Sequence, residues 1–522
     1  MALNVKPSVG TPGQRLLRQV DSFVDMLQAA YGPGGRYFQI NRGDGNPLYT
    51  RRGKAIIRAL EPELNQLGAG ALLIRKAALK TSWQSGDGSI TTAILARTLL
   101  MSGREKILLG HSPDDLVRGI VKSAGDVVSY LRDQALSARD PVVIEKISRN
   151  LADEDDELGG MVAKAFNQLG GEGIVDCEDS GGEDSSARMV SGIKFEGGYL
   201  TSQFCTEDSS SAIVFRNALL LLCDGVVSDP GTVVPALRKA MAVRRPLVII
   251  AQGFSTDVRV DLLTCALSRS CQNVPVVVEK APKVRRTVMN DVAAVTGGQV
   301  LEGDTGRRLQ DVVFAHLGKA GKVIVTRNRS TIMAGWGNRQ SMRERCYHLA
   351  MGKRPAEHSG LRPAARDTHR LSDGAVMLRL GAESDYLRRQ REARGNDMCR
   401  TLNSGFKFGF LPGGGTTLLH AGAAIEEGAL SLLESNGADA LRRALKEPLR
   451  VILQNAGRDA PFIGRILEDE NSTRVGFNAS LGSSDDLVKA GVLDSAFVVE
   501  TSLINAVSAA TSILGREVKP RS

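Results

Sequence analysis

The 522-residue chain is poor in aromatic side chains, which make up 4% of it, and it has only 6 histidines. Few aromatics leave few platforms on which nucleic-acid bases can stack, so no nucleic-acid partner is expected, although the net charge of +9 favours anionic partners such as phosphates. The histidines show no metal-ligand spacing and are interpreted as surface or satisfied residues. They are His111, His316, His348, His358, His369 and His420.

Cysteine pairs and long apolar runs are also lacking. The 7 cysteines are scattered singly without CxxC spacing, which argues against a disulfide framework and a zinc knuckle and favours a reducing compartment. The first residues, MALNVKPSVGTPGQ, hold no apolar segment of a signal peptide, and the aliphatic runs are far shorter than the ~20 residues that span a bilayer. We therefore expect a cytoplasmic protein without a membrane partner.

Several common catalytic motifs are missing. No Gly-Lys pair is followed by Ser or Thr, which excludes a Walker P-loop, and GxGxxG, GxSxG and HExxH do not occur. These absences argue against dinucleotide, hydrolase-elbow and zinc-protease sites. The function of a metabolic enzyme that uses ATP is also disfavoured, because the sequence shows no set of catalytic residues for a small substrate.

The chain length predicts two to four domains of roughly 100 to 200 residues. Apolar residues at three and four spacing predict helices from residue 15 to 135 and again after Ser404. Between Leu219 and Thr326, short aliphatic runs such as Leu247–Ala251 alternate with amphipathic stretches, which predicts an α/β domain. The pattern therefore indicates one discontinuous, mostly helical domain around an α/β insertion.

A glycine-rich stretch, GDGSITTAILARTLL at Gly86–Leu100, combines features of a phosphate site. Its glycines permit close backbone approach, Ser89 and Thr91 supply hydroxyls, and the following helix directs its positive N-terminal end at the loop. Asp87 would repel phosphate unless a cation stood between them, which favours Mg²⁺. An ordinary N-cap loop uses the same residue types, so this stretch alone leaves both interpretations open.

Two further glycine clusters lie beside predicted helices. YGPGGR at Tyr31–Arg36 follows one, and LPGGGTTLLHAGAA at Leu411–Ala424 leads into another. Either cluster could be a simple connector between helices. Three such clusters in the two helical flanks nevertheless favour a phosphate site that the flanks share.

These stretches resemble the group I chaperonins, the GroEL type, in the same order over nearly the whole chain. YGPGGR is similar to the family's LGPKGR, GDGSITTAILA to GDGTTTATVLA, and FEGGYLTSQF to GYLSPYF. RPLVIIAQ resembles KPLLIIAE, GFLPGGGTTLL resembles GVVAGGGVALI, and KAGVLDSAFV resembles the late GILDPTKV element. Similarity between the motifs is low, which makes this chain a divergent member.

The resemblance implies a multidomain α and α/β architecture and an ATP-dependent chaperone. Residues 1–133 and 408–522 would form an equatorial ATP-binding domain, 134–190 and 375–407 an intermediate hinge domain, and 191–374 an apical substrate-binding domain. Family members form homo-oligomeric rings, usually of seven subunits, that capture unfolded client proteins and release them through ATP-driven motion. The ring number and the need for a lid co-chaperonin stay open.

The resemblance also implies site residues. Asp397 would orient the attacking water, Asp87 would hold Mg²⁺, and Asp494 would accept hydrogen bonds from ribose hydroxyls. The full set expected to contact the nucleotide is Gly32, Pro33, Asp87, Gly88, Ser89, Thr91, Gly414, Asn478, Ala479 and Asp494.

Two departures concern the nucleotide site. Arg52 stands where the family has a second acid, so hydrolysis is either slowed or assisted by a cation that neutralises transition-state charge. Ala30 and Ile90 replace family threonines, which removes hydroxyls and leaves K⁺ open as a second cation. The alternative function is therefore a chaperonin-fold ring protein with weak or lost ATP turnover that binds or holds other proteins.

A third departure concerns the apical surface. Five apolar residues match client-binding positions and, because of the resemblance, are expected to line an exposed groove, although the residues alone favour a plain core. Gln203, Arg259 and Thr264 stand where the family prefers apolar residues, which predicts a narrower or more selective groove. The five are Tyr199, Phe204, Val234, Leu237 and Leu263.

Overall fold

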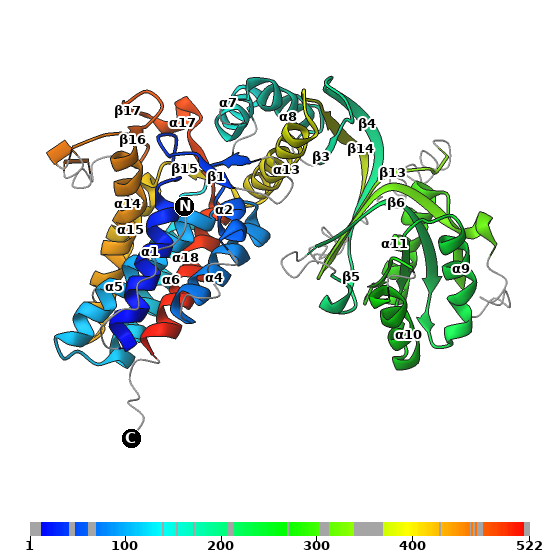
Figure 1. Ribbon diagram of the computed structural model, residues 1–522, viewed down its shortest axis with the longest axis horizontal. Helices are drawn as coiled ribbons and strands as arrows, with labels where there is room; N and C mark the ends of the chain where they lie inside the picture. The colour runs from blue at the N-terminus through cyan, green and yellow to red at the C-terminus, as the bar shows by residue number, and fades with distance from the viewer. Residues whose placement is uncertain are drawn as a thin grey trace, which may run out of the picture. The chain divides into compact units, whose positions relative to one another are not determined.

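The computed structural model divides into two compact units, Met1–Gly171 with Asp385–Ser522 and Glu172–Ser384 (Figure 1). His348 and His358 lie outside the residues that it describes. Those residues are 12–40, 47–60, 69–137, 140–152, 155–170, 173–205, 212–268, 271–302, 313–338, 369–426, 428, 430–459, 461–462, 465–466 and 473–515.

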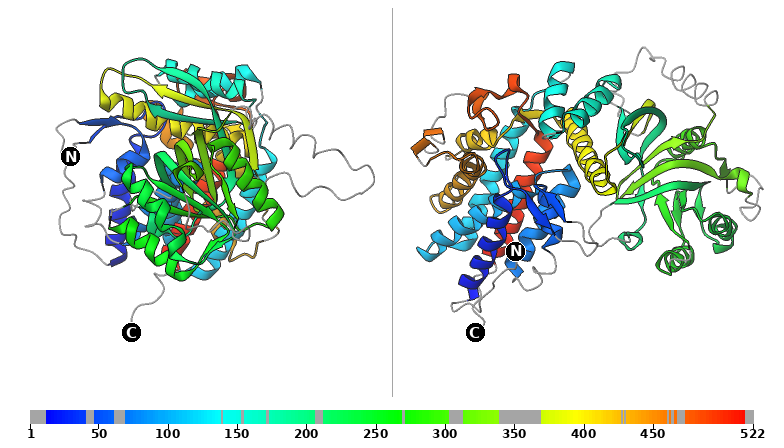
Figure 2. Two further views of the ribbon diagram at one scale, coloured as in Figure 1. Left: turned by 90° about the vertical axis from the view of Figure 1, so that its right-hand side faces the viewer. Right: turned by 45° about the horizontal axis from the view of Figure 1, so that its top comes forward.

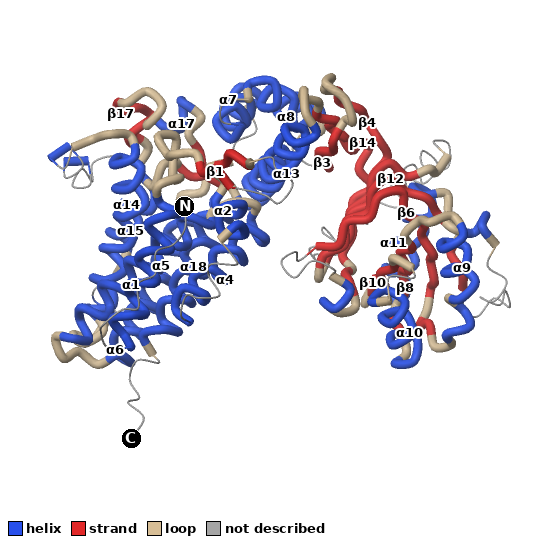
Figure 3. The backbone as a smooth tube through the Cα atoms, viewed as in Figure 1, coloured by secondary structure: helices blue, strands red, loops and turns tan. Residues whose placement is uncertain are grey.

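The first unit is built on long helices from both ends of the chain (Figure 3). Helix α18 packs against α4, α5 and α6, and α15 packs against α5 and α6. Their inward faces form one continuous apolar core, which includes Phe23, Ile94 and Leu503. The expected union of the two helical flanks is therefore confirmed. The helices are α1 (Pro12–Gln28), α4 (Ala69–Ser85), α5 (Ser89–Leu108), α6 (Pro113–Asp133), α15 (Ser435–Asn455) and α18 (Ala496–Leu514).

Helix α18 is long and apolar enough to cross a membrane by composition, but 67% of its most apolar window is buried inside the protein. Both Leu503 and Ala510 are fully buried. Small and hydroxyl-bearing residues interrupt its aliphatic runs, so no long uninterrupted run marks it in the sequence. It is the central core helix of this unit.

A second helical group in the first unit consists of α7 (Pro141–Ala152), α8 (Asp156–Gln168) and α13 (Asp385–Phe408). Arg391 on α13 donates to Asp155 at 2.7 Å, and Arg394 donates to the Ala152 carbonyl at 2.9 Å. These charged contacts fasten α13 to the α7–α8 connection. The division of this region into separate equatorial and hinge domains stays a prediction.

Short elements complete the first unit. They are β1 (Phe38–Ile40), β2 (Leu48–Thr50), α2 (Gly53–Ala59), β15 (Phe410–Pro412), α14 (Thr416–Ala421), β16 (Val475–Asn478), β17 (Ser483–Asp486), α17 (Leu487–Ala490) and β18 (Leu493–Ser495). The strands form three antiparallel pairs. In β1–β2 and β16–β17 the two strands follow each other in the chain, whereas β15–β18 joins segments that are far apart in the sequence.

The second unit contains a ten-stranded mixed sheet. Its order is β3-β14-β4-β13-β12-β6-β8-β10-β5, with β11 also paired to β6. The strands are β3 (Ile174–Asp179), β4 (Ser186–Glu196), β5 (Gly198–Tyr199), β6 (Ala212–Asp224), β8 (Leu247–Ala251), β10 (Asn273–Val277), β11 (Val300–Glu302), β12 (Gly318–Thr326), β13 (Arg329–Gly335) and β14 (His369–Leu380). A separate short pair joins β7 (Val226–Val227) to β9 (Gly253–Phe254).

Strands β6, β8 and β10 are parallel, and α9 (Val234–Ala242), α10 (Thr256–Leu267) and α11 (Pro282–Thr296) lie along this part of the sheet (Figure 2). Buried aliphatic strands with crossover helices are typical of α/β structure, so the expected α/β insertion is confirmed. The long antiparallel strands β4, β13 and β14 were not predicted, because their alternating side chains give no continuous apolar run.

Helices α6 and α15 cross with almost no side chain between their backbones. An added Cβ at Gly119 of α6 would lie 2.0 Å from the Glu434 carbonyl oxygen. By contrast, a Cβ at Gly125 of the same helix would meet nothing within 4 Å. The crossing therefore needs glycine at position 119 and not at position 125.

Gly119→Ala is expected to lower the apparent melting temperature, because backbone must move to admit the methyl group, at a cost of about 2 kcal/mol or more. Gly125→Ala is the matched control and should stabilise the helix by about 0.5 kcal/mol or more. Thermal unfolding followed by circular dichroism measures both. Equal melting temperatures for the two variants would contradict the close crossing.

Candidate functional site

A cavity of about 570 Å³ opens in the first unit among the glycine-rich loops. Its wall includes all eleven residues that the resemblance assigns to ATP, from Gly32 near one end of the chain to Asp494 near the other. Residues of α7 and α13 complete the wall. The fold therefore brings the three glycine clusters and Asp397 to one place.

The glycines in this wall have backbone conformations that other residues rarely adopt. Gly32, Gly88 and Gly414 have φ values of +76°, +87° and +66°. A Cβ at Gly88 would also lie 2.4 Å from the Ser502 hydroxyl. Because α5 begins directly after Gly88, its free backbone N–H groups lie beside the cavity, as in anion sites at helix N-termini.

A buried polar network holds the Gly88 loop in place. The Thr92 hydroxyl lies 2.9 Å from the Gly88 carbonyl oxygen and 2.8 Å from the Thr81 hydroxyl. Asn505 of α18 donates to the same Thr81 hydroxyl at 2.9 Å. Helices α4, α5 and α18 are thus joined directly behind the loop, so its geometry depends on both ends of the chain.

Two carboxyl groups face the cavity from opposite segments. The Asp87 carboxylate accepts the Gly88 N–H at 2.7 Å. Burial, together with the negative charge of Asp87, raises the pKa of Asp494 to about 6. Strand β18 presents Asp494, paired with Leu411 of β15.

The donor set suits Mg²⁺ bound together with phosphate. Magnesium takes hard oxygen ligands and is commonly held by one or two carboxylates plus phosphate oxygens. In the described part of the chain, no group of three or more His, Cys, Asp or Glu side chains is arranged so that it could hold a metal ion by itself. Asp87 would therefore share the ion with the nucleotide. Ala30 and Ile90 also line the cavity. The hydroxyl groups of the two family threonines at these positions are therefore missing from its wall.

Asp397 is paired rather than free. Arg52 donates through Nη2 to the Asp397 carboxylate and to the Ala393 carbonyl at 3.1 Å. Arg400 Nη1 lies 3.7 Å from the other oxygen of Asp397. Burial and the charge of Arg394 lower the pKa of Arg52 to about 10, which still leaves it cationic at neutral pH.

Sequence reasoning missed part of the wall. Arg149 and Asn150 come from α7, and Arg394 comes from α13. Arg394 precedes Asp397 by three residues, so helical spacing places both on one face and is the signal that could have identified it. Nothing in the sequence around α7 indicates contact with a glycine loop.

Helix α7 lies against the turn before Asp494. Asn150 donates to the Gly491 carbonyl at 2.7 Å, and Lys146 donates to the Lys489 carbonyl at 2.7 Å. Gly491 has a φ of +74°, and a Cβ there would lie 2.3 Å from the Lys146 Cβ. The α7–α8–α13 group is thus docked on this side of the cavity.

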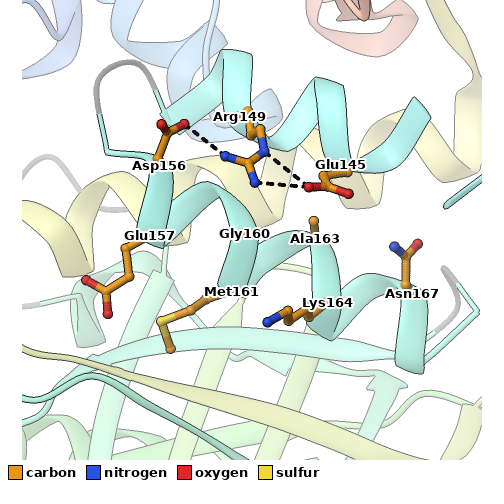
Figure 4. A pocket seen from close by; sticks show the side chains of 9 residues that line it. All are labelled: Glu145, Arg149, Asp156, Glu157, Gly160, Met161, Ala163, Lys164 and Asn167. Atoms are coloured by element: carbon orange, nitrogen blue, oxygen red, sulfur yellow. Dashed lines mark hydrogen bonds and ion pairs between the residues drawn. The ribbon is translucent and has the colours of Figure 1, made fainter. Parts of the chain in front are cut away.

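A second cavity, of about 320 Å³, lies along α7 and α8, and most of the residues around it are charged or polar (Figure 4). Arg149 donates to Glu145 at 3.0 Å and to Asp156 at 3.1 Å, which ties the two helices together. Arg149 and Asp156 also line the first cavity. These contacts account for the residues as a helix–helix link.

The five expected client-binding residues, all in the second unit, differ in exposure. Phe204 and Leu237 are only 4% and 6% exposed and belong to the core, so their expected place in an exposed groove is wrong in this structure. Tyr199 and Leu263 are half-buried against that core, and Val234 is 36% exposed. Val234 and Leu237 are one turn apart on α9, so helical spacing places them close together. Leu237 shares the buried face with Ala236 and Ala240, whereas Val234 lies at the edge of that face, on the side of the exposed Arg238 and Met241.

Other apolar side chains on the same helices are exposed. Val260 and Leu267 of α10 and Met241 of α9 were not predicted. Thr264 shares the outward face of α10 and is exposed. Their spacing of three and four residues along α10 was a usable signal.

The model of the TCP-1/cpn60 chaperonin family matches residues 23–234 and 205–517, and the chain therefore belongs to this family. It is a divergent group I chaperonin. The chain is similar to the crystal structure of the chaperonin gp146 from the bacteriophage EL 2 (Pseudomonas aeruginosa), solved in the presence of ATP-BeFx, with a TM-score of 0.65 and 16% identity over 96% of each chain. At this identity the likeness shows a shared fold.

The raised pKa of Asp494 predicts a pH-dependent stability. Folding raises this pKa from 3.8 to about 6, so the folded protein binds the Asp494 proton more tightly than the unfolded chain does. The contribution of this proton to the stability of the fold is fully present below pH 3.8 and is lost as pH rises through 6. Asp494→Asn should therefore raise the free energy of unfolding of the nucleotide-free protein at pH 7.5 by on the order of 1 kcal/mol, and with it the melting temperature, and should have little effect at pH 4. A stabilisation that is equal at both pH values would contradict the assigned cause.

Proposed function

We propose that this protein is an ATP-dependent chaperonin that captures non-native proteins and assists their folding through ATP-driven conformational change. The observation that carries the proposal is the convergence of three sequence-distant glycine clusters, Asp87 and Asp397 on one cavity. A family-typical chaperonin function is consistent with the membership described above.

In the proposed reaction, water attacks the γ-phosphorus of ATP, the bond to the β-phosphate oxygen breaks, and ADP and phosphate leave. Backbone N–H groups at the start of α5 hold phosphate oxygens, and the Gly32 and Gly414 loops let the nucleotide approach the main chain. Asp397 accepts a hydrogen bond from the water and orients it. Asp87 would hold Mg²⁺, which offsets the phosphate charge.

The Asp494 carboxyl and the segment with Asn478 and Ala479 would contact the nucleoside. Asn478 is buried, and its side chain is fixed by a hydrogen bond from the Ser480 N–H at 3.2 Å. A fixed polar side chain at a cavity wall provides orientation at low entropic cost.

Hydrolysis would be coupled to motion through α13, which carries Asp397. Because α13 is joined to α7 and α8, movement of this group would carry Asp397 toward or away from the nucleotide. In the proposed assembly, homo-oligomeric rings, seven-membered as in the resembling family, act in the cytoplasm. ATP-driven motion of the apical region then releases the client.

The Arg52–Asp397 pair favours one alternative function. A carboxylate occupied by a guanidinium is a weaker acceptor for water. A chaperonin-fold ring protein with slow or absent turnover would then bind or hold other proteins. Nucleotide binding without phosphate release by the wild-type protein would select this alternative.

Asp397→Ala is expected to lower the rate of phosphate release by about 100-fold, since it removes the group that orients water. Nucleotide affinity should be retained. Asp385→Ala, on the first turn of the same helix and 76% exposed, is the control and should keep the wild-type rate. An unchanged rate in Asp397→Ala would show that another residue performs this step.

Val234→Ser is expected to weaken capture of a chemically denatured client roughly fivefold at an unchanged melting temperature, because it removes about 1 kcal/mol of exposed apolar contact. Leu237→Ser, on the same helix, should instead lower the melting temperature, because it leaves a cavity and a hydroxyl in the core. Suppression of client aggregation and thermal unfolding measure the two effects. Full capture by Val234→Ser would exclude this residue from the client surface.

A further inference from the structure

Guanidinium groups gather around the Asp397 carboxylate. Arg52 and Arg394 line the cavity, and Arg400 approaches the carboxylate from outside its wall. Arg52 and Arg400 thus pair with the Asp397 carboxylate, and the positive charge of Arg394 acts on Arg52. Arg52 and Arg394 therefore place two cations on the cavity wall, which favours an anionic ligand there.

The backbone beside Arg52 lies close to the start of α5. Its N–H donates to the Thr50 hydroxyl at 3.1 Å, where β2 turns into α2. An added Cβ at the next residue, Gly53, would lie 2.5 Å from Ser89 Oγ and from Ile90 Cγ1. The chain at Arg52 is therefore pressed against the first turn of α5, whose N–H groups face the same cavity.

The contacts of Arg52 leave it able to change partner. Its side chain is 28% exposed and that of Asp397 is 21% exposed, so neither is sealed in the core. Both lie on the cavity wall. A terminal phosphate carries more charge than a carboxylate and accepts the two parallel N–H groups of a guanidinium in a fork. Phosphate is thus the stronger partner wherever both are within reach.

We propose that Arg52 is the group that distinguishes a nucleoside triphosphate from a diphosphate in this cavity. With the terminal phosphate present, its guanidinium moves from Asp397 to that phosphate, and Asp397 is freed to orient water. With the diphosphate, Arg52 stays on Asp397 and keeps the carboxylate occupied. This inference rests on the proposed ATP site. It gives a function to a positive charge at a position where the GroEL-type chaperonins have an acid.

The test is calorimetric titration of the full-length protein with ADP and with the non-hydrolysable analogue AMP-PNP, both with Mg²⁺. Arg52→Ala should reduce the preference for AMP-PNP over ADP by about tenfold or more, the effect of one lost charge-assisted hydrogen bond. ADP affinity should change by less than about threefold. Arg52→Lys keeps the positive charge but lacks the two parallel N–H groups of a guanidinium. Its preference for AMP-PNP over ADP should therefore lie between that of the wild-type protein and that of Arg52→Ala.

Arg400→Ala is the matched control, because it removes a cation near Asp397 that is not among the residues lining the cavity. It should keep the wild-type preference. Suppose that the wild-type protein binds both nucleotides. If both Arg52 variants then kept the wild-type preference for AMP-PNP over ADP, the inference would be overturned and the proposed function would stand. A wild-type protein that binds neither nucleotide would instead overturn the proposed function.

Discussion

The candidate site depends on the buried hydrogen-bond network behind the Gly88 loop. The Thr81 hydroxyl there lies 2.8 Å from the Thr92 hydroxyl and 2.9 Å from the Asn505 side-chain nitrogen. The three residues belong to helices from opposite ends of the chain. Buried polar groups must find partners inside the protein, so this contact couples the position of the loop to the docking of α18. The network thus holds the carbonyl group of Gly88, which has a positive φ, at the point where α5 begins.

Charge organises the other wall of the cavity. The Arg52–Asp397 pair ties the β2–α2 connection to α13, and Arg391 and Arg394 tie α13 to α7 and α8. Such pairs are readily exchanged for another anion when they are partly exposed. The Arg52–Asp397 pair lies on the cavity wall and is therefore the contact for which a phosphate could compete.

The second unit illustrates how an amphipathic helix divides its residues. Leu237 and Val234 are one turn apart on α9, yet Leu237 belongs to the core and Val234 lies at the exposed edge of the buried face. A match of residue type to a family position cannot distinguish these two orientations, because both are apolar. Exposure must be taken from the packing of the helix on its sheet, which also shows the outward Val260 and Leu267 of α10.

The sequence by itself determined the discontinuous helical unit, the α/β insertion and the glycine clusters, because periodicity and glycine placement are local properties. It also named the cavity residues through a resemblance of short motifs. Only the tertiary structure decided the partner of Arg52, the presence of Arg149 and Asn150 in the wall, and the burial of Phe204 and Leu237. These features arise between segments far apart in the chain, where neither spacing nor residue type specifies which side chains meet.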